Sequence, residues 1–326
     1  MNKKTWIIVL LLIGSILISS NAFSAWTQAK GHSYNQLTFS YYVTDHKFTT
    51  IENEPETNGE IGAITNPNGS NHRVPQAKFV SQKLTYYGEY GITDKLTIFT
   101  AIPYDWQTSD DTIKYAGERG PSGVGDINLG LRHSLVGNLF NTGMLMSIQG
   151  EVKIPEAYDY GYPLSHLSLG DGQYDATIAI LFGKGFDWGY GWANIGYKFR
   201  FENDQYDPYS FDPSDQFKLS FGGGYPVTSW LALRGIVAWT KSVGNSSVSN
   251  ELMRDYYINY GGINTYGDTV LIKDTLGLEA DVLSAGIDLA FSINPKVQTV
   301  ISYNRDLIGK DAGQGESISV AFVYIH

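Results

Sequence analysis

The sequence predicts an all-β fold: a transmembrane antiparallel β-barrel of about twelve strands, preceded by an N-terminal signal peptide. Three observations support this class: an apolar N-terminal run, an aromatic-rich composition, and long segments in which apolar and polar residues alternate. Of the 326 residues, 14% are aromatic and 17% are charged, and there is no Cys. Disulfides therefore cannot hold this fold, and after the N-terminal run no segment approaches the roughly 20 apolar residues of a membrane-spanning helix.

Residues 1–24 are expected to be a cleaved signal peptide. Two lysines precede an apolar run at residues 6–18, and small residues at Ala22 and Ser24 suit signal peptidase, so the mature chain should begin at Ala25. A membrane anchor is the alternative, but the run is shorter than a spanning helix requires. Residues 25–326 are predicted to form a single outer-membrane barrel domain, exported through the inner membrane of a Gram-negative cell.

The expected strands are segments in which polarity alternates from one residue to the next. The clearest are residues 126–132, 144–154, 193–201, 216–221 and 297–304. A soluble sandwich would show the same alternation. Aromatic residues near the ends of the runs favour a membrane barrel, because its interfacial girdles lie there; these residues are Tyr90, Trp106, Tyr190, Trp192, Trp230 and Trp239.

The connections between the expected strands alternate in length. Short turns are expected at residues 92–95, 136–141, 185–189, 225–229 and 294–296, and longer loops at 44–76, 108–122, 156–171, 203–214, 243–275 and 309–315. These connections join twelve strands and leave both termini on the short-turn side, which is the periplasmic side of bacterial barrels, so loops 44–76 and 243–275 should be extracellular. Ten or fourteen strands stay open as alternatives, because residues 276–283, assigned to the tenth strand, also fit a short helix or the end of a loop.

The C-terminal strand and several turns resemble those of known outer-membrane proteins. Residues 318–326 place apolar side chains and His326 on one face, similar to the strands that barrel-assembly machinery recognises, although those usually end in Phe. The segments 90–96, 122–132 and 170–175 are similar to the barrel family labelled putative MetA-pathway of phenol degradation. That resemblance implies a transporter-like barrel often associated with aromatic compounds.

The inward face of the barrel is where selectivity is expected. The alternation predicts that charged side chains of both signs line the pore: Lys83, Glu89, Asp126, Arg132, Glu151, Lys153, Asp175, Lys198, Arg200, Lys218, Arg234 and Asp288. They could pair across strands and stiffen the wall, because buried charges must be paired or hydrated. Alternatively, the bases from Lys198 to Arg234 could form a ladder for a polar or anionic solute crossing the narrow lumen of a twelve-stranded barrel.

No catalytic, metal or cofactor site is predicted. His133 and Ser134 are neighbours on a strand and therefore point to opposite faces, which argues against a catalytic dyad. Other histidines, at positions 32, 46, 72 and 166, show no metal-ligand spacing. The acidic loops have no EF-hand register, although whether they bind divalent cations stays open.

These patterns leave three functional hypotheses. The first is a porin-like channel or transporter for small polar or aromatic solutes. The second is a closed barrel whose surface loops serve a structural, adhesive or biofilm-related role, and a lipid-modifying enzyme ranks last. Expected partners are outer-membrane lipids, lipopolysaccharide, the barrel-assembly machinery and a small solute. The net charge of −10 argues against nucleic acid.

Overall fold

The computed structural model describes residues 25–49, 51–53, 63–65, 72–110, 120–163, 167–260 and 270–326. The predicted signal peptide, residues 1–24, lies outside these ranges, as do residues 50, 54–62 and 66–71 of loop 44–76 and His166. Among the described residues, no helix is both long enough and apolar enough to cross a membrane.

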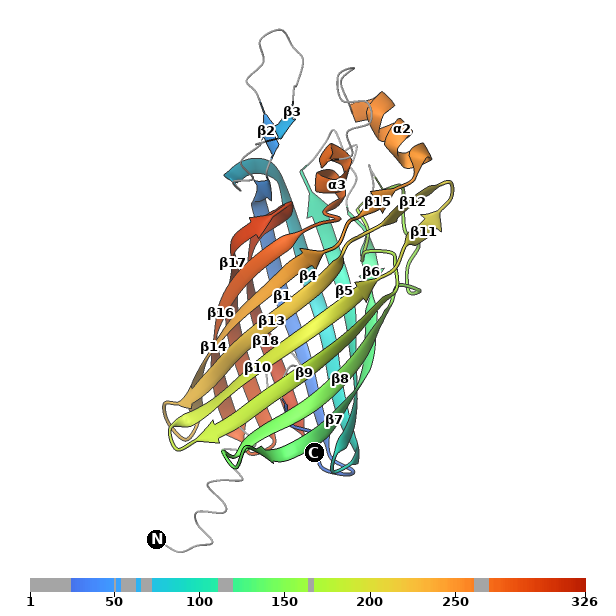
Figure 1. The fold of residues 1–326 in the computed structure, drawn as a ribbon. Helices are drawn as coiled ribbons and strands as arrows, with labels where there is room; N and C mark the ends of the chain where they lie inside the picture. Colours follow the sequence, from blue (N-terminus) through green and yellow to red (C-terminus); the bar gives the residue numbers. More distant parts are fainter. Residues whose placement is uncertain are drawn as a thin grey trace, which may run out of the picture.

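Twelve antiparallel strands form a closed barrel, which confirms the predicted fold class and strand count (Figure 1). Each strand pairs with its neighbour along the chain, and the first and last strands close the ring through pairs such as Tyr34 with Ile325. The strands are β1 (Ser33–Thr49), β4 (His72–Thr93), β5 (Leu96–Ser109), β7 (Ile127–Leu139), β8 (Met144–Ile154), β9 (Asp175–Phe186), β10 (Gly189–Arg200), β13 (Asp215–Pro226), β14 (Leu231–Val243), β16 (Asp281–Asn294), β17 (Val297–Lys310) and β18 (Ala312–Ile325). A short strand, β6 (Ser122–Val124), extends the pairing of β5.

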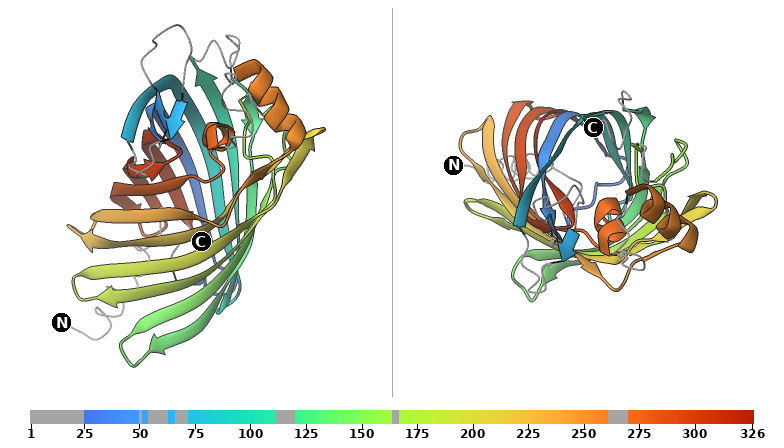
Figure 2. Two further views of the ribbon diagram at one scale, coloured as in Figure 1. Left: turned by 45° about the horizontal axis from the view of Figure 1, so that its top comes forward. Right: turned by 90° about the horizontal axis from the view of Figure 1, so that it is seen from above.

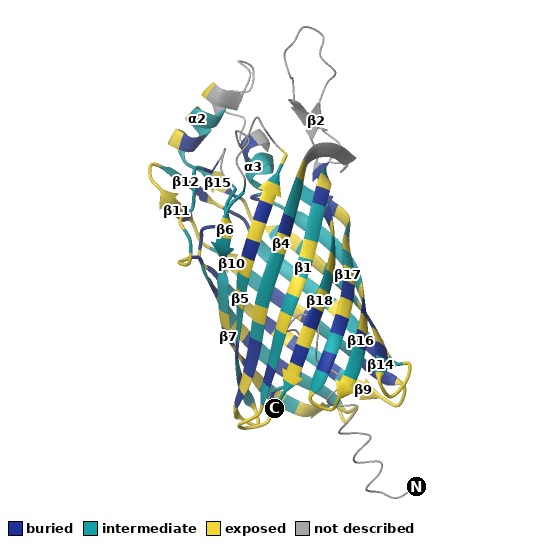
Figure 3. Ribbon diagram, turned by 180° about the vertical axis from the view of Figure 1, so that it is seen from behind, coloured by how far each residue is buried: buried dark blue, intermediate teal, exposed yellow. Residues whose placement is uncertain are grey.

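The two faces of each strand differ in the way the alternation predicts. Large apolar residues such as Leu37 and Phe39 on β1 are 44% and 46% exposed, because their side chains point away from the lumen. Exposed and less exposed residues alternate along β1 and β5 (Figure 3). An outward apolar belt on a closed barrel leaves no unpaired sheet edge to face lipid, which is the requirement for a strand protein that spans a membrane.

The five short turns lie together at one end of the barrel, at the bottom of Figure 1, and the C-terminus lies at the same end. They connect β4 to β5, β7 to β8, β9 to β10, β13 to β14 and β16 to β17, as predicted. The turn between β7 and β8 carries a left-handed backbone at Phe140 and Asn141, followed by Gly143 with φ 74°.

The opposite end carries the longer connections and a small hydrophobic cluster (Figure 2). Short strands β2 (Ile51–Asn53), β3 (Ala63–Thr65), β11 (Asn203–Tyr206), β12 (Tyr209–Asp212) and β15 (Ser247–Val248) lie here with helices α2 (Asn250–Tyr260) and α3 (Val270–Leu276). Phe211, Leu252, Ile272 and Leu278 form the buried centre of the cluster, which joins α2 and α3 to the loop between β10 and β13.

Three expectations about this end were wrong in detail. The predicted loop 309–315 is a single residue, Asp311, because β17 and β18 continue to either side of it. The wall at β1 and β4 is also taller than predicted, since β1 reaches Thr49 and β4 begins at His72. The tenth strand starts only at Asp281, and the segment before it is the end of α3 and a turn.

Candidate functional site

The barrel lumen is the candidate functional site. It contains a cavity of about 570 Å³ lined by residues of β1, β4, β5, β7, β8, β10, β14 and β16 to β18. On β1 the lining runs from Tyr34 to Tyr42, which corresponds to about 26 Å of extended strand. The cavity therefore follows much of the height of the barrel wall.

The N-terminal segment, residues Ala25–His32, crosses the lumen at the short-turn end. The backbone N–H of Gln28 donates to Thr97 Oγ1 at 2.8 Å on β5, and the carbonyl of Ala25 accepts from Ser147 Oγ at 2.5 Å on β8. Ala25 is 1% exposed and packs against Ala179 and Leu181 of β9. Because β8 and β9 lie far around the ring from β1, the segment spans the lumen instead of following one wall.

The alternation pattern did not reveal this segment. It contains no strand, and it is held through backbone groups and the side chain of Gln28. The only sequence signal is its position: a short stretch between the predicted cleavage site and the first strand, with Trp26 among small and polar residues. Trp26 meets Tyr190 edge to face, with ring centroids 6.3 Å apart.

A buried ion pair fixes the N-terminal segment to the wall. Arg132 Nη1 lies 3.0 Å from Glu89 Oε1, and both side chains are at most 1% exposed. The same guanidinium donates to the carbonyl of Trp26 at 3.0 Å and to Gln149 Oε1 at 3.0 Å, while Glu89 accepts from Gln28 Nε2 at 2.7 Å. Charges so deeply buried are stable only when paired and hydrogen-bonded, and the segment supplies some of those bonds.

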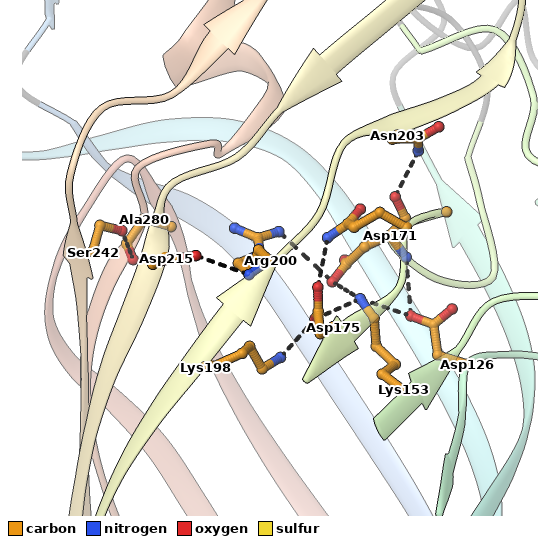
Figure 4. Close-up of polar contacts among 12 residues, drawn as sticks. Asp126, Lys153, Asp171, Asp175, Lys198, Arg200, Asn203, Asp215, Ser242 and Ala280 are labelled. Carbon is orange, nitrogen blue, oxygen red and sulfur yellow. Dashed lines mark hydrogen bonds and ion pairs between the residues drawn. The ribbon is translucent and has the colours of Figure 1, made fainter. Parts of the chain in front are cut away.

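A second charged network lies at the long-loop end, where β8 and β10 end and β9 begins (Figure 4). Lys153 Nζ lies 2.8 Å from Asp171, 2.9 Å from Asp175 and 3.4 Å from Asp126. Lys198 adds a 3.0 Å contact to Asp175, and Arg200 lies 3.8 Å from Asp171. These contacts hold the loop between β8 and β9 against the wall.

The loop groups of this network have shifted pKa values. Desolvation alone would raise the pKa of Asp171, but Lys153 and Arg200 outweigh it and hold that pKa well below its usual range. Asp171 therefore stays ionised at any physiological pH. Desolvation and a 2.6 Å hydrogen bond to Asp126 raise the pKa of Tyr158, so its hydroxyl stays protonated and also accepts from the N–H of Gly172.

Most of the predicted pore-lining residues form ion pairs, and two of them do not. Lys83 pairs with Asp105 at 3.5 Å and Arg234 with Asp288 at 3.2 Å, in addition to the pairs already described. Three of the four bases of the proposed ladder thus have carboxylate partners. Within the described chain, Glu151 and Lys218 form no ion pair, although they are close enough to interact electrostatically. The pairing favours the stiffened wall over the ladder, and a pore-lining role for the set stays a prediction.

Two of the six aromatic residues assigned to the interfacial girdles face the lumen instead. Tyr190 and Trp192 line the cavity, whereas Trp230 and Trp239 are 54% and 38% exposed on the outside. Parity along β10 places Tyr190 and Trp192 on the same face as Lys198, so the alternation itself contained this information. Their position near the end of an alternating segment wrongly suggested that they belong to the interfacial girdle.

The described histidines considered for catalysis or metal binding lie in different parts of the fold. His133 is exposed on the outside of β7, while the backbone N–H of Ser134 donates to Lys95 in the adjacent turn. Among the described residues, no group of three or more His, Asp or Glu side chains could hold a metal ion. His32 contacts the carbonyl of His326 through Nδ1 at 2.9 Å, which links the two ends of the barrel domain.

Comparison with solved structures supports the fold. The chain is similar to an outer membrane channel from Pseudomonas putida F1, with 14% identity, 95% of this chain and 100% of that chain covered, and a TM-score of 0.67. The translocator domain of autotransporter NalP from Neisseria meningitidis (10% identity, 91% and 89% covered) and the NanC porin (5% identity, 88% and 98% covered) both reach a TM-score of 0.44, which is too low to support any argument. No protein-family model and no curated protein matches the sequence. The closed barrel with its lipid-facing belt is that of a bacterial outer-membrane protein.

Proposed function

We propose that the protein is a narrow outer-membrane channel or transporter for small polar or aromatic solutes. The observation that carries this proposal is the luminal cavity of about 570 Å³, which runs along the inside of the wall from the N-terminal segment toward the long-loop end. Eight strands can fill their interior with side chains, whereas a twelve-stranded barrel is wide enough to leave a constricted passage of this kind.

The similar barrel from Pseudomonas putida F1 is described as an outer membrane channel, which supports the same role here. We also place the chain with the barrels labelled putative MetA-pathway of phenol degradation, on the strength of the turn and strand segments given above. The first likeness names no solute and the second implies only an association with aromatic compounds, so the solute class has to be inferred from the chemistry of the lumen. We assign no catalytic function to the barrel.

A closed barrel with a structural or adhesive role is the second candidate. The N-terminal segment across one end of the lumen and the Lys153 network at the other favour it. The two candidates differ in one measurable property, which is whether ions or solutes pass through the lumen.

Single-channel recording in planar bilayers tests the proposal. Ser319 on β18 lines the cavity, and the adjacent Val320 points to the outside, where it is 37% exposed. We expect discrete conductance steps for the wild type and steps at least about twofold smaller for Ser319→Trp, because the indole would occupy the lumen. Val320→Trp is the matched control and should conduct like the wild type. A correctly folded barrel that never conducts would exclude the channel and leave the structural role.

A further inference from the structure

Aromatic side chains on the luminal wall lie over glycines of neighbouring strands. Trp192 on β10 stands directly across from Gly222 on β13, and a Cβ built on that glycine would come within 2.8 Å of the indole Cζ2. Tyr190 likewise covers Gly224, two residues along the same pair of strands. The arrangement recurs elsewhere on the wall, where Phe99 covers Gly130 and Tyr42 covers Gly315.

The absence of a Cβ lets each ring rest against the backbone of the wall. Any larger residue at Gly222 or Gly224 would push the ring toward the middle of the lumen. The glycines thus keep the lumen open although large aromatic residues face inward. A ring held against the wall also turns one face to the cavity, where it can stack on a solute.

Two of these four rings are open to the cavity. Phe99 is 2% exposed and Tyr190 is 4% exposed, the former beneath the Arg132 guanidinium and the latter against Trp26. Trp192 and Tyr42 are only partly buried and line the cavity. Trp192 lies near the short-turn end of β10, and Tyr42 lies further toward the long loops on β1, which is opposite β10 in the ring.

Hydroxyl and amide groups make up much of the remaining wall. Ser319 of β18 is in register with Ser40 of β1 on one side and with Ser302 of β17 on the other, and all three line the cavity. Thr38 and Asn304 continue this polar surface along the same strands. Such an array offers many uncharged hydrogen-bond donors and acceptors. A solute with one hydroxyl could bond to only a few of them.

The charges that border the cavity disfavour anions. The carboxylates that line it are Glu151, Asp288, Asp306 and Glu316, whereas the bases are Arg305 and Arg234, the latter already paired with Asp288 at 3.2 Å. An anionic solute would meet an excess of negative charge there. A neutral solute would meet no such repulsion.

We propose that the cavity is a binding site for an uncharged, polyhydroxylated ring solute of the sugar class. The apolar face of a sugar ring stacks on Trp192 or, further toward the long loops, on Tyr42, while its hydroxyls bond to the serine, threonine and asparagine side chains of the wall. This inference rests on the proposed channel function and narrows its solute class. It favours sugars over aromatic hydrocarbons, because a hydrocarbon would displace water from the polar array without offering hydrogen bonds in return.

Ligand titration of the detergent-solubilised barrel by saturation-transfer NMR tests the site independently of transport. The probes are maltose, its carboxylate derivative maltobionate, and phenol. We expect maltose to bind, maltobionate to bind more weakly, and Trp192→Ala to weaken maltose binding about tenfold, in line with the loss of a stacking contact. Trp192→Phe should restore most of the affinity, and Trp239→Ala, which removes an outward indole, should leave it unchanged.

The outcomes separate the site from the channel. Maltose that does not bind the wild type, or an affinity that Trp192→Ala leaves unchanged, overturns the sugar site. Phenol binding that depends on Trp192 while maltose does not bind reassigns the cavity to aromatic solutes and also overturns it. If maltose binds but liposomes that contain the barrel do not swell in isotonic maltose, the site is upheld and the channel is contradicted.

Discussion

The paired charges inside the lumen show how single residues hold this barrel. Arg132 and Glu89 are almost fully buried, and each also bonds to the N-terminal segment. Removing one partner would leave the other charge buried without compensation, at a cost of about 3–5 kcal/mol. Parity along the strands is sufficient to place both side chains inside. Their pairing could not be predicted, because strand registers and the course of the N-terminal segment are not encoded in local alternation.

Asp311 carries a testable pH dependence. Burial, and then the neighbouring carboxyl of Asp274 on α3, raise the pKa of Asp311 to about 6, while Lys310 and Lys47 act in the opposite direction. Between its ordinary pKa and this raised value, the folded state binds more protons than the unfolded state. Docking of α3 should therefore be strongest in acid and should weaken as the pH rises through about 6.

Hydrogen exchange of residues 270–276, corrected for intrinsic rates, measures this effect. Protection should be higher at about pH 5 than at about pH 7.5. Asp311→Asn should remove most of the difference, because the amide does not ionise and Asn tolerates the φ of 49° at this position. A pH dependence that survives in this variant would show that another group is responsible.

At the level of elements, local sequence signals predicted the strands and short turns well. Tight turns such as that between β4 and β5 are marked by a few turn-forming residues between two alternating segments, so they could be predicted directly from the sequence. Local signals did not predict the connection at Asp311 or helices α2 and α3. These features depend on packing at the long-loop end, as in the cluster around Leu252 and Ile272. The N-terminal segment was missed for a related reason, since it makes no regular structure.

The N-terminal segment should restrict flow through the lumen. A chain that starts at Gly31, refolded in detergent, should show larger conductance steps than the chain that starts at Ala25. The Glu89–Arg132 ion pair joins two wall strands directly, so the barrel should still close without the segment, although the pair loses its bonds to Gln28 and Trp26. Thr27→Ala is the control, because the Thr27 hydroxyl contacts only the carbonyl of Asp94 in a turn. Equal conductance with and without the segment would show that the constriction lies elsewhere.

At the level of the whole molecule, the barrel has an apolar outside and a polar inside. Phe39 and Thr38 are adjacent on β1, but Phe39 is 46% exposed on the outer face and Thr38 lines the cavity. This inversion relative to a soluble protein was predictable, because the predicted export signal and the aromatic content indicated which face meets lipid. The solute was not predictable, because it depends on which rings lie over which glycines across neighbouring strands.

The two faces should respond differently to the same charge. Phe39→Arg should destabilise the barrel by about 2–4 kcal/mol, as expected for arginine near the bilayer midplane. Thr38→Arg should cost much less, because its guanidinium would enter the polar lumen, where it should instead shift ion selectivity toward anions. Urea unfolding in lipid vesicles measures the first effect and reversal potentials the second. Equal destabilisation by both variants would contradict this assignment of faces.

The burial of Ala25 has a consequence for how the protein is processed. If the leader is removed at the predicted bond between Ser24 and Ala25, the protease determines how much polypeptide remains inside the barrel. A cut two residues later would remove Ala25 and Trp26, and with them the contacts to Ser147 and Arg132. Accurate maturation during export would then set the diameter of the passage, so a leader peptidase acting at the inner membrane would help to define permeability at the outer one.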